Sequence, residues 1–223
     1  MNSLRVVSGV RIFSLFSVSL LLIAASIGCR SAYYAAYEKF GVYKRDLLKK
    51  RVVEARDEQA QAGEQFKDAL TRLKELSGFD GGKLERGYTE LQQEFKECET
   101  QASKVKDRIT AMDTVANDLF SEWSREIEQI TTPSLAKSSK EQLAQTKERY
   151  AALSASLKKA EESMAPILVQ FRDYVLYLKH NLNAQAIASL RGEATSIQNE
   201  VGRLISQMNA AIARADQFVK ELQ

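Results

Sequence analysis

The chain has 223 residues, of which 44% are hydrophobic and 27% charged, and its formal net charge is +3. Two prolines and ten glycines are too few for an all-β fold of many strands, which needs a turn signal every few residues. One histidine and two cysteines nearly exclude the usual zinc, haem and Cys/His catalytic sites, so no metal or cofactor is expected.

Residues 1–28 have the pattern of a bacterial lipoprotein signal peptide. Arg5 and Arg11 are the only charged residues in this segment, and an uncharged apolar run follows them. The run ends in the letters SIGC at residues 26–29, which resemble a lipobox and predict lipidation of Cys29 and cleavage before it. An uncleaved transmembrane anchor is one alternative, but seventeen apolar residues span only about 26 Å of a bilayer core of roughly 30 Å. A plain secretory signal is the other, and it leaves the position of Cys29 unexplained.

Removal of the signal changes the charge balance. The mature chain, residues 29–223, keeps 30 basic and 29 acidic residues, so its net charge is +1 and gives no support for nucleic-acid binding. The second mature residue is Arg30 and not the Asp that retains lipoproteins in the inner membrane. We therefore expect the protein to be anchored in the outer membrane by its N-terminal lipid and to face the periplasm.

The mature chain is predicted to be all-α: an elongated antiparallel bundle, or coiled coil, of three to four long helices in one domain. Apolar residues recur in steps of three and four, which is typical of one buried helix face. The predicted helices cover about residues 32–77, 83–130, 135–180 and 184–221.

Local signals separate these helices. Gly78, Gly81 and Gly82 predict a reversal, and Thr132 before Pro133 predicts a helix N-terminus. Pro166 predicts a kink inside the third helix. The break at residues 180–183 is less certain from the pattern: the apolar spacing continues through it, whereas two asparagines favour a cap or turn, and we favour the break.

Aromatic and basic residues gather just after the lipidation site. Tyrosine favours the headgroup region of a bilayer and basic side chains are attracted to anionic lipid, so this segment predicts a membrane interface. Packing of the same aromatic residues at one end of the bundle explains the pattern equally well. The residues concerned are Tyr33, Tyr34, Tyr37, Phe40 and Tyr43 with Lys39, Lys44 and Arg45.

Four segments resemble a family of bacterial envelope lipoproteins catalogued as domain of unknown function 2959. They are residues 37–70, 79–88, 119–123 (LFSEW) and 175–190, and the similarity extends, in the expected order, over nearly all of the mature chain. The resemblance implies a helical, often lipid-anchored envelope protein. The resemblance identifies no catalytic or binding residues in this chain.

No catalytic motif is recognised. Gly81-Gly82-Lys83 lacks the first glycine and the final hydroxyl residue of a phosphate-binding loop. Cys98 is a lone thiol and is expected on a half-buried helix face. We predict a structural or adaptor protein that binds an envelope partner, or itself, through helix faces, with no small-molecule substrate identified. A membrane-shaping module is one alternative, and an enzyme with a site near Asp173, Lys179, His180 and Asn183 is another.

Overall fold

The computed structural model describes residues 34, 37, 39, 41–78 and 84–222. The chain divides into two compact units, Met1–Leu47 and Leu48–Gln223. The prediction of one domain over residues 29–223 did not include this division. The signal segment, Cys29, Tyr33 and Phe40 lie outside the described residues.

All regular structure in the described part of the chain is helical, which confirms the all-α prediction. The helices are α2 (Lys44–Ser77), α3 (Leu84–Ile127), α4 (Pro133–Glu162), α5 (Met164–His180) and α6 (Ala184–Glu221). Helix α3 alone has 44 residues, a length of about 66 Å at 1.5 Å per residue. Helix α2 begins in the first unit and continues into the second.

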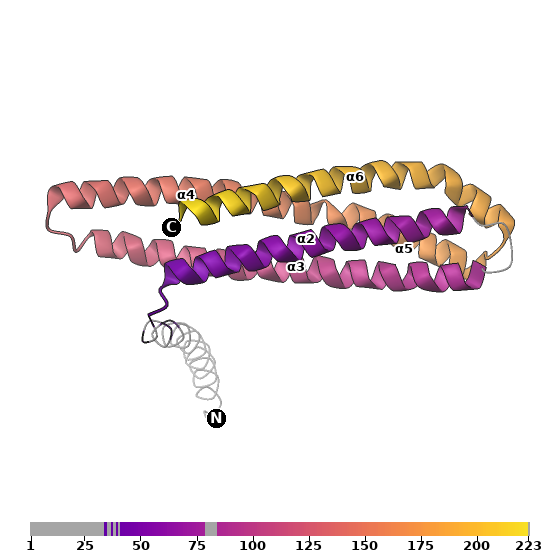
Figure 1. Cartoon of the computed structure of the whole chain (residues 1–223), viewed down its shortest axis with the longest axis horizontal. Helices are drawn as coiled ribbons and strands as arrows, with labels where there is room; N and C mark the ends of the chain where they lie inside the picture. The colour runs from indigo at the N-terminus through magenta and orange to yellow at the C-terminus, as the bar shows by residue number, and fades with distance from the viewer. Residues whose placement is uncertain (1–33, 35–36, 38, 40, 79–83, 223) are drawn as a thin grey trace, which may run out of the picture. The chain divides into compact units, whose positions relative to one another are not determined.

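The second unit is an antiparallel bundle. Figure 1 shows α3 returning beside α2, α4 and α5 together running back along α3, and α6 returning beside them. Helices α3 and α6 each pack against both α4 and α5. Helix α2 is joined to α3 by a hydrogen bond from Gln65 to Glu94 (2.7 Å) and to α6 by an ion pair between Arg56 and Asp216 (2.6 Å).

The core follows the predicted helical spacing. Burying these side chains removes apolar surface from water, which is the main stabilising contribution to such a bundle. The fully buried positions with the largest side chains come from α2, α3, α4 and α5: Phe66, Phe171, Leu48, Leu73, Leu76, Leu91, Met112, Leu153, Leu157, Met164, Ile167 and Leu178.

The first predicted helix is interrupted near its beginning. Tyr34, Tyr37 and Lys39 are helical, but Gly41 has a φ of 74° and α2 begins only at Lys44. A φ in this left-handed region costs a residue with a Cβ about 1–2 kcal/mol, so glycine is suited to the position. The Asp46 carboxylate then accepts a hydrogen bond from the Tyr43 amide (3.2 Å) at the start of α2. The uninterrupted helix expected over residues 32–77 is therefore corrected to one with a turn at Gly41.

The third predicted helix is two helices. Instead of a kink at Pro166, the chain breaks at Ser163, between α4 and α5. Proline has no N–H, and its ring clashes with the carbonyl four residues earlier, which here is that of Glu162. The break therefore falls three residues before the proline, and Pro166 itself lies in the first turn of α5.

The other predicted boundaries agree with the structure within a few residues. Helix α2 ends at Ser77, α3 ends at Ile127 and α4 begins at Pro133 directly after Thr132. The expected break at residues 180–183 is present. There the Asn183 side chain accepts a hydrogen bond from the Ala186 amide (3.0 Å), which caps α6.

Candidate functional site

The aromatic and basic residues of the predicted membrane interface lie in the first unit, and they differ in exposure. Tyr34 is buried, and the Lys44 ammonium lies 4.6 Å from the centroid of its ring. Tyr37 is half-buried. Tyr43 is 61% exposed, and Lys39 and Arg45 are also exposed. Among the described residues of the predicted interface, Tyr43 and these two cations are exposed.

A polar cluster between α3 and α4 was not predicted from the sequence. The Asp113 carboxylate accepts hydrogen bonds from the hydroxyls of Tyr150 (2.6 Å) and Ser154 (2.9 Å), and it pairs with the Lys158 ammonium (2.6 Å). Tyr150, Ser154 and Lys158 are spaced four residues apart, so they share one face of α4. That spacing was visible in the sequence, but the position of Asp113 opposite it was not.

The electrostatics of this cluster favour an ionised carboxylate and a neutral phenol. Burial by itself would raise the pKa of Asp113, but the hydrogen bonds from its three partners outweigh it, so the pKa lies below its ordinary value. Burial, and then the hydrogen bond to Asp113, raise the pKa of Tyr150. All the polar groups of the cluster thus bind one another, and the cluster joins two helices.

A second polar layer joins α2 and α3. The buried Glu58 carboxylate accepts a hydrogen bond from the Gln101 amide (2.7 Å) and pairs with Arg108 (3.3 Å). Next to it, Gln59 is fully buried and donates a long bond to the Leu157 carbonyl (3.5 Å). These groups also serve interhelical contacts.

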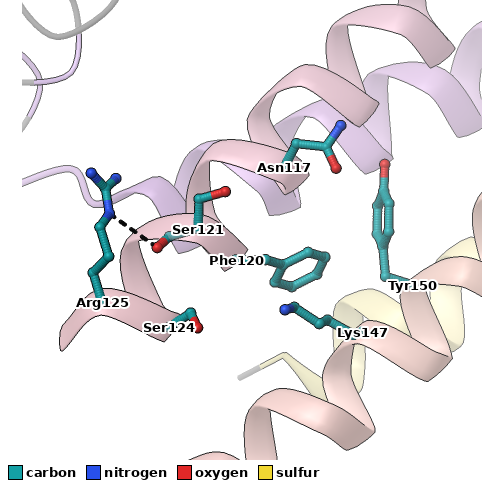
Figure 2. Close-up of a pocket in the computed structure, with 7 residues that line it drawn as sticks. All are labelled: Asn117, Phe120, Ser121, Ser124, Arg125, Lys147 and Tyr150. Atoms are coloured by element: carbon teal, nitrogen blue, oxygen red, sulfur yellow. Dashed lines mark hydrogen bonds between the residues drawn. The ribbon is translucent and has the colours of Figure 1, made fainter. Parts of the chain in front are cut away.

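An open cavity of about 820 Å³ lies between α3 and α4 beside the Asp113 cluster. Figure 2 shows Phe120 and Tyr150 side by side, the Lys147 ammonium near Phe120, and Arg125 turned back to the Ser121 carbonyl. The Lys147 nitrogen is 5.9 Å from the Phe120 ring centroid. The lining holds two cations, two aromatic rings and small polar groups: Asn117, Phe120, Ser121, Ser124, Arg125, Lys147 and Tyr150.

No hydrogen bond or ion pair of the described residues joins the members of the alternative enzyme site to one another. The Asp173 carboxylate lies 3.7 Å from the guanidinium of Arg172, its neighbour in sequence. The Asn183 side chain caps α6, and His180 and Lys179 are exposed at the end of α5. Within the described residues, no three His, Cys, Asp or Glu side chains are placed to hold a metal ion.

Cys98 is buried, and not half-buried as expected from the sequence. Its thiol contacts the Gln65 carbonyl (3.5 Å). Burial, with the nearby carboxylates of Glu94 and Glu97 contributing further, raises the pKa of this thiol. A buried thiol with a raised pKa is unreactive at neutral pH.

None of the helices in the described part of the chain is long and apolar enough to cross a bilayer.

Comparison with known proteins gives one family match. No curated protein sequence matches the chain significantly. Residues 33–222 match the family described as "Protein of unknown function (DUF2959)", which is most of the chain and includes all five described helices. The chain belongs to this family.

Proposed function

We propose that this protein is a lipid-anchored bacterial envelope protein, attached to the outer membrane through Cys29, and that it acts as an adaptor. The SIGC sequence at residues 26–29 and the absence of Asp at position 30 support the anchor and its location. The polar groups of the Asp113 cluster bind one another and join α3 to α4, and Glu58 with Gln101 and Arg108 joins α2 to α3. We expect a partner protein on the exposed faces of the helices.

The observation that carries the adaptor role is the exposed apolar face of α5. Val169, Leu176 and Tyr177 are 45%, 54% and 41% exposed. Leu176 and Tyr177 follow Val169 by seven and eight residues, about two helical turns, so the three side chains lie on one face of the helix. In the rest of the second unit, Leu135 is the other large apolar residue described as exposed. Apolar side chains exposed together suit a protein–protein contact, and we propose that the apolar face of a partner helix covers them.

Site-specific crosslinking tests this proposal. A photoreactive amino acid replaces Leu176 in the full chain, and the matched control replaces Asn209, an exposed polar residue of α6. We expect an adduct of defined mass from position 176 that is absent from position 209 and is lost when Val169→Asp is added. An adduct with the mass of two copies identifies the partner as a second molecule of this chain. Equal labelling from both positions contradicts the docking face.

A second candidate function is membrane-surface binding by the start of α2 and the residues before it. Tyr43, Lys39 and Arg45 are exposed there. An aromatic side chain among cations suits an anionic bilayer surface. The two candidate functions use different residues, so they can be tested separately.

Vesicle flotation tests the membrane contact. The Lys39→Gln/Arg45→Gln variant is compared with Lys137→Gln/Lys140→Gln, which removes two exposed cations from α4 instead. We expect only the first variant to bind more weakly to vesicles containing phosphatidylglycerol, with no difference on pure phosphatidylcholine. The effect should shrink as salt rises, because salt screens surface charges. Equal binding of the two variants argues against this contact.

A further inference from the structure

The exposed apolar face of α5 lies opposite the face that packs into the bundle. At 100° per residue, Leu176 falls within about 20° of Val169 around the helix, and Tyr177 falls about 80° from it. The core side chains of α5 fall about 160–240° from Val169, and they are Met164, Ile167, Phe171, Val175 and Leu178. The line from Val169 to Leu176 therefore points away from the rest of the bundle.

Two opposite charges border this apolar line, one on each side. Measured around the helix from Val169, Arg172 lies about 60° to one side and Asp173 about 40° to the other. Their side chains are 54% and 63% exposed, and the guanidinium lies 3.7 Å from the carboxylate. An exposed ion pair of this kind contributes little to stability. Both groups can therefore pair with charges on another molecule at little cost to the fold.

A face with a cation on one edge and an anion on the other is complementary to a copy of itself. In a two-fold pair of parallel helices, each edge of one helix meets the opposite edge of the other at the same height. Arg172 of each copy then faces Asp173 of the other, and Leu176 faces Tyr177. Charged residues that flank an apolar seam determine partner and orientation in this way in coiled coils.

The antiparallel arrangement of the same two helices is less favourable. A two-fold pair of antiparallel helices brings like edges together, so the two Asp173 carboxylates meet when the apolar residues Val169 and Leu176 are opposite each other. Like charges placed together at an interface select against the arrangement that contains them. Charge complementarity therefore favours the parallel pair.

We propose that a second copy of this chain covers the apolar face of α5, in a parallel two-fold dimer with reciprocal ion pairs between Arg172 and Asp173. This inference rests on the proposed adaptor function and names the partner of its docking face. Both copies use the same patch, as in other two-fold dimers. One face of one helix is smaller than a standard interface, which has roughly 20–30 residues a side. The dimer is accordingly weak and reversible.

Cysteine crosslinking in isolated cell envelopes tests the pairing and its direction. Val169→Cys and Leu176→Cys are made separately in the full chain, with the wild type and Asn209→Cys, an exposed position of α6, as controls. Oxidation with copper phenanthroline should link both α5 variants into dimers, at least fivefold more than either control. In a parallel pair each of these residues lies opposite itself. An antiparallel pair can bring only one of the two positions opposite itself, because they are about 10 Å apart along the helix and a disulfide needs Cα atoms within about 7 Å.

Charge reversal tests the ion pairs. Arg172→Asp and Asp173→Arg, each added to Val169→Cys, should reduce the yield of dimer at least threefold, because like charges then face each other. The double variant Arg172→Asp/Asp173→Arg should restore the yield, since the two edges again carry opposite charges. Both residues are exposed, so the far-ultraviolet circular dichroism of the three variants should match that of the wild type.

The outcomes separate this inference from the adaptor role. If neither cysteine variant exceeds the controls, while the photoreactive residue at position 176 gives an adduct of another mass, the dimer is wrong and the adaptor role stands. A dimer from only one of the two positions contradicts the parallel arrangement. A double charge variant that stays monomeric contradicts the reciprocal ion pairs. Absence of any adduct at position 176, together with no disulfide dimer, overturns both proposals.

Discussion

Tyr150 on α4 donates a hydrogen bond of 2.6 Å to the carboxylate of Asp113 on α3, 37 residues away in the sequence. The same oxygen accepts a bond from Ser154 (2.9 Å), and the other oxygen pairs with Lys158 (2.6 Å). One carboxylate on α3 thus binds two turns of α4. A shift of either helix along the other would separate these groups, so the cluster favours one alignment of the pair.

Removing the charge of Asp113 should therefore destabilise the bundle. Asp113→Asn keeps the shape of the side chain but loses the ion pair and weakens the two hydroxyl bonds. We expect the free energy of unfolding to fall by about 1–2 kcal/mol, a value reduced for the partial exposure of the group. Urea unfolding followed by circular dichroism measures this. The control is Asp107→Asn, an exposed carboxylate of α3 with no ion pair among the described residues, which should change stability little.

The contribution of Asp113 should also depend on pH, in a direction that follows from its pKa. The pKa of this carboxyl is lowered in the folded protein, so the unfolded chain binds more protons in the acidic range and stability rises with pH there. The stabilisation is complete at pH values above the ordinary pKa of aspartate, about 3.9. It is lost as the pH falls through the lower pKa that Asp113 has in the folded protein.

The difference in unfolding free energy between the wild type and Asp113→Asn should thus be constant from pH 5 to pH 7 and decrease below about pH 4. Urea unfolding at each pH measures it. A difference that increases on acidification would show that the carboxylate is not stabilised by its partners.

Replacement of Gly41 and of Gly202 by alanine should have opposite effects on stability, although both glycines have free space around them. A Cβ added at Gly41 or at Gly202 meets no heavy atom within 4 Å, but Gly41 has a φ of 74° whereas Gly202 lies inside α6. Gly41→Ala should destabilise its turn by about 1 kcal/mol. Gly202→Ala should raise the free energy of unfolding by roughly 0.5–1 kcal/mol, because alanine favours a helix.

Amide hydrogen exchange locates the first of these effects. The amides of Asp46 and Leu47 are bonded to the Tyr43 carbonyl (2.9 and 3.0 Å) just after the turn. Their exchange should become about fivefold faster in Gly41→Ala, the factor that corresponds to 1 kcal/mol. It should not change in Gly202→Ala. Similar exchange in both variants would mean that the backbone at Gly41 accepts any residue.

The proposed lipid anchor depends on Cys29. Cys29→Ser removes the thiolate that accepts the lipid, and a hydroxyl is a much poorer nucleophile. The precursor should then keep its 28-residue signal segment and remain in the inner membrane. The bundle should fold normally, because Cys29 precedes all the described helices. Membrane fractionation of the variant and mass spectrometry of the wild-type N-terminus measure these outcomes. An unmodified wild-type N-terminus, or normal processing of the variant, would show that the protein is not a lipoprotein.

The amino-acid sequence alone was sufficient for features that depend on a few neighbouring residues or on a repeated pattern. The apolar steps of three and four determine which face of each helix is buried, as in α3 from Leu91 to Ile127. Pro133 begins α4, and Asn183 caps α6 as the pair of asparagines indicated. These signals act within one turn of a helix, so they can be predicted from neighbouring residues without knowledge of the rest of the chain.

The tertiary structure decided how the helices are aligned and which polar groups meet. Asp113 reaches Tyr150, and Glu58 reaches Gln101 and Arg108, only because the helices that carry them pack in one particular alignment along their axes. Local context was also insufficient at Gly41 and Ser163, where a helix pattern continues through a break. Contacts between residues distant in sequence determine how far each helix is displaced along its neighbour. A pattern of apolar residues every three or four positions is compatible with several such displacements. For this reason neither the Asp113 cluster nor the polar layer around Glu58 was part of the sequence-based prediction.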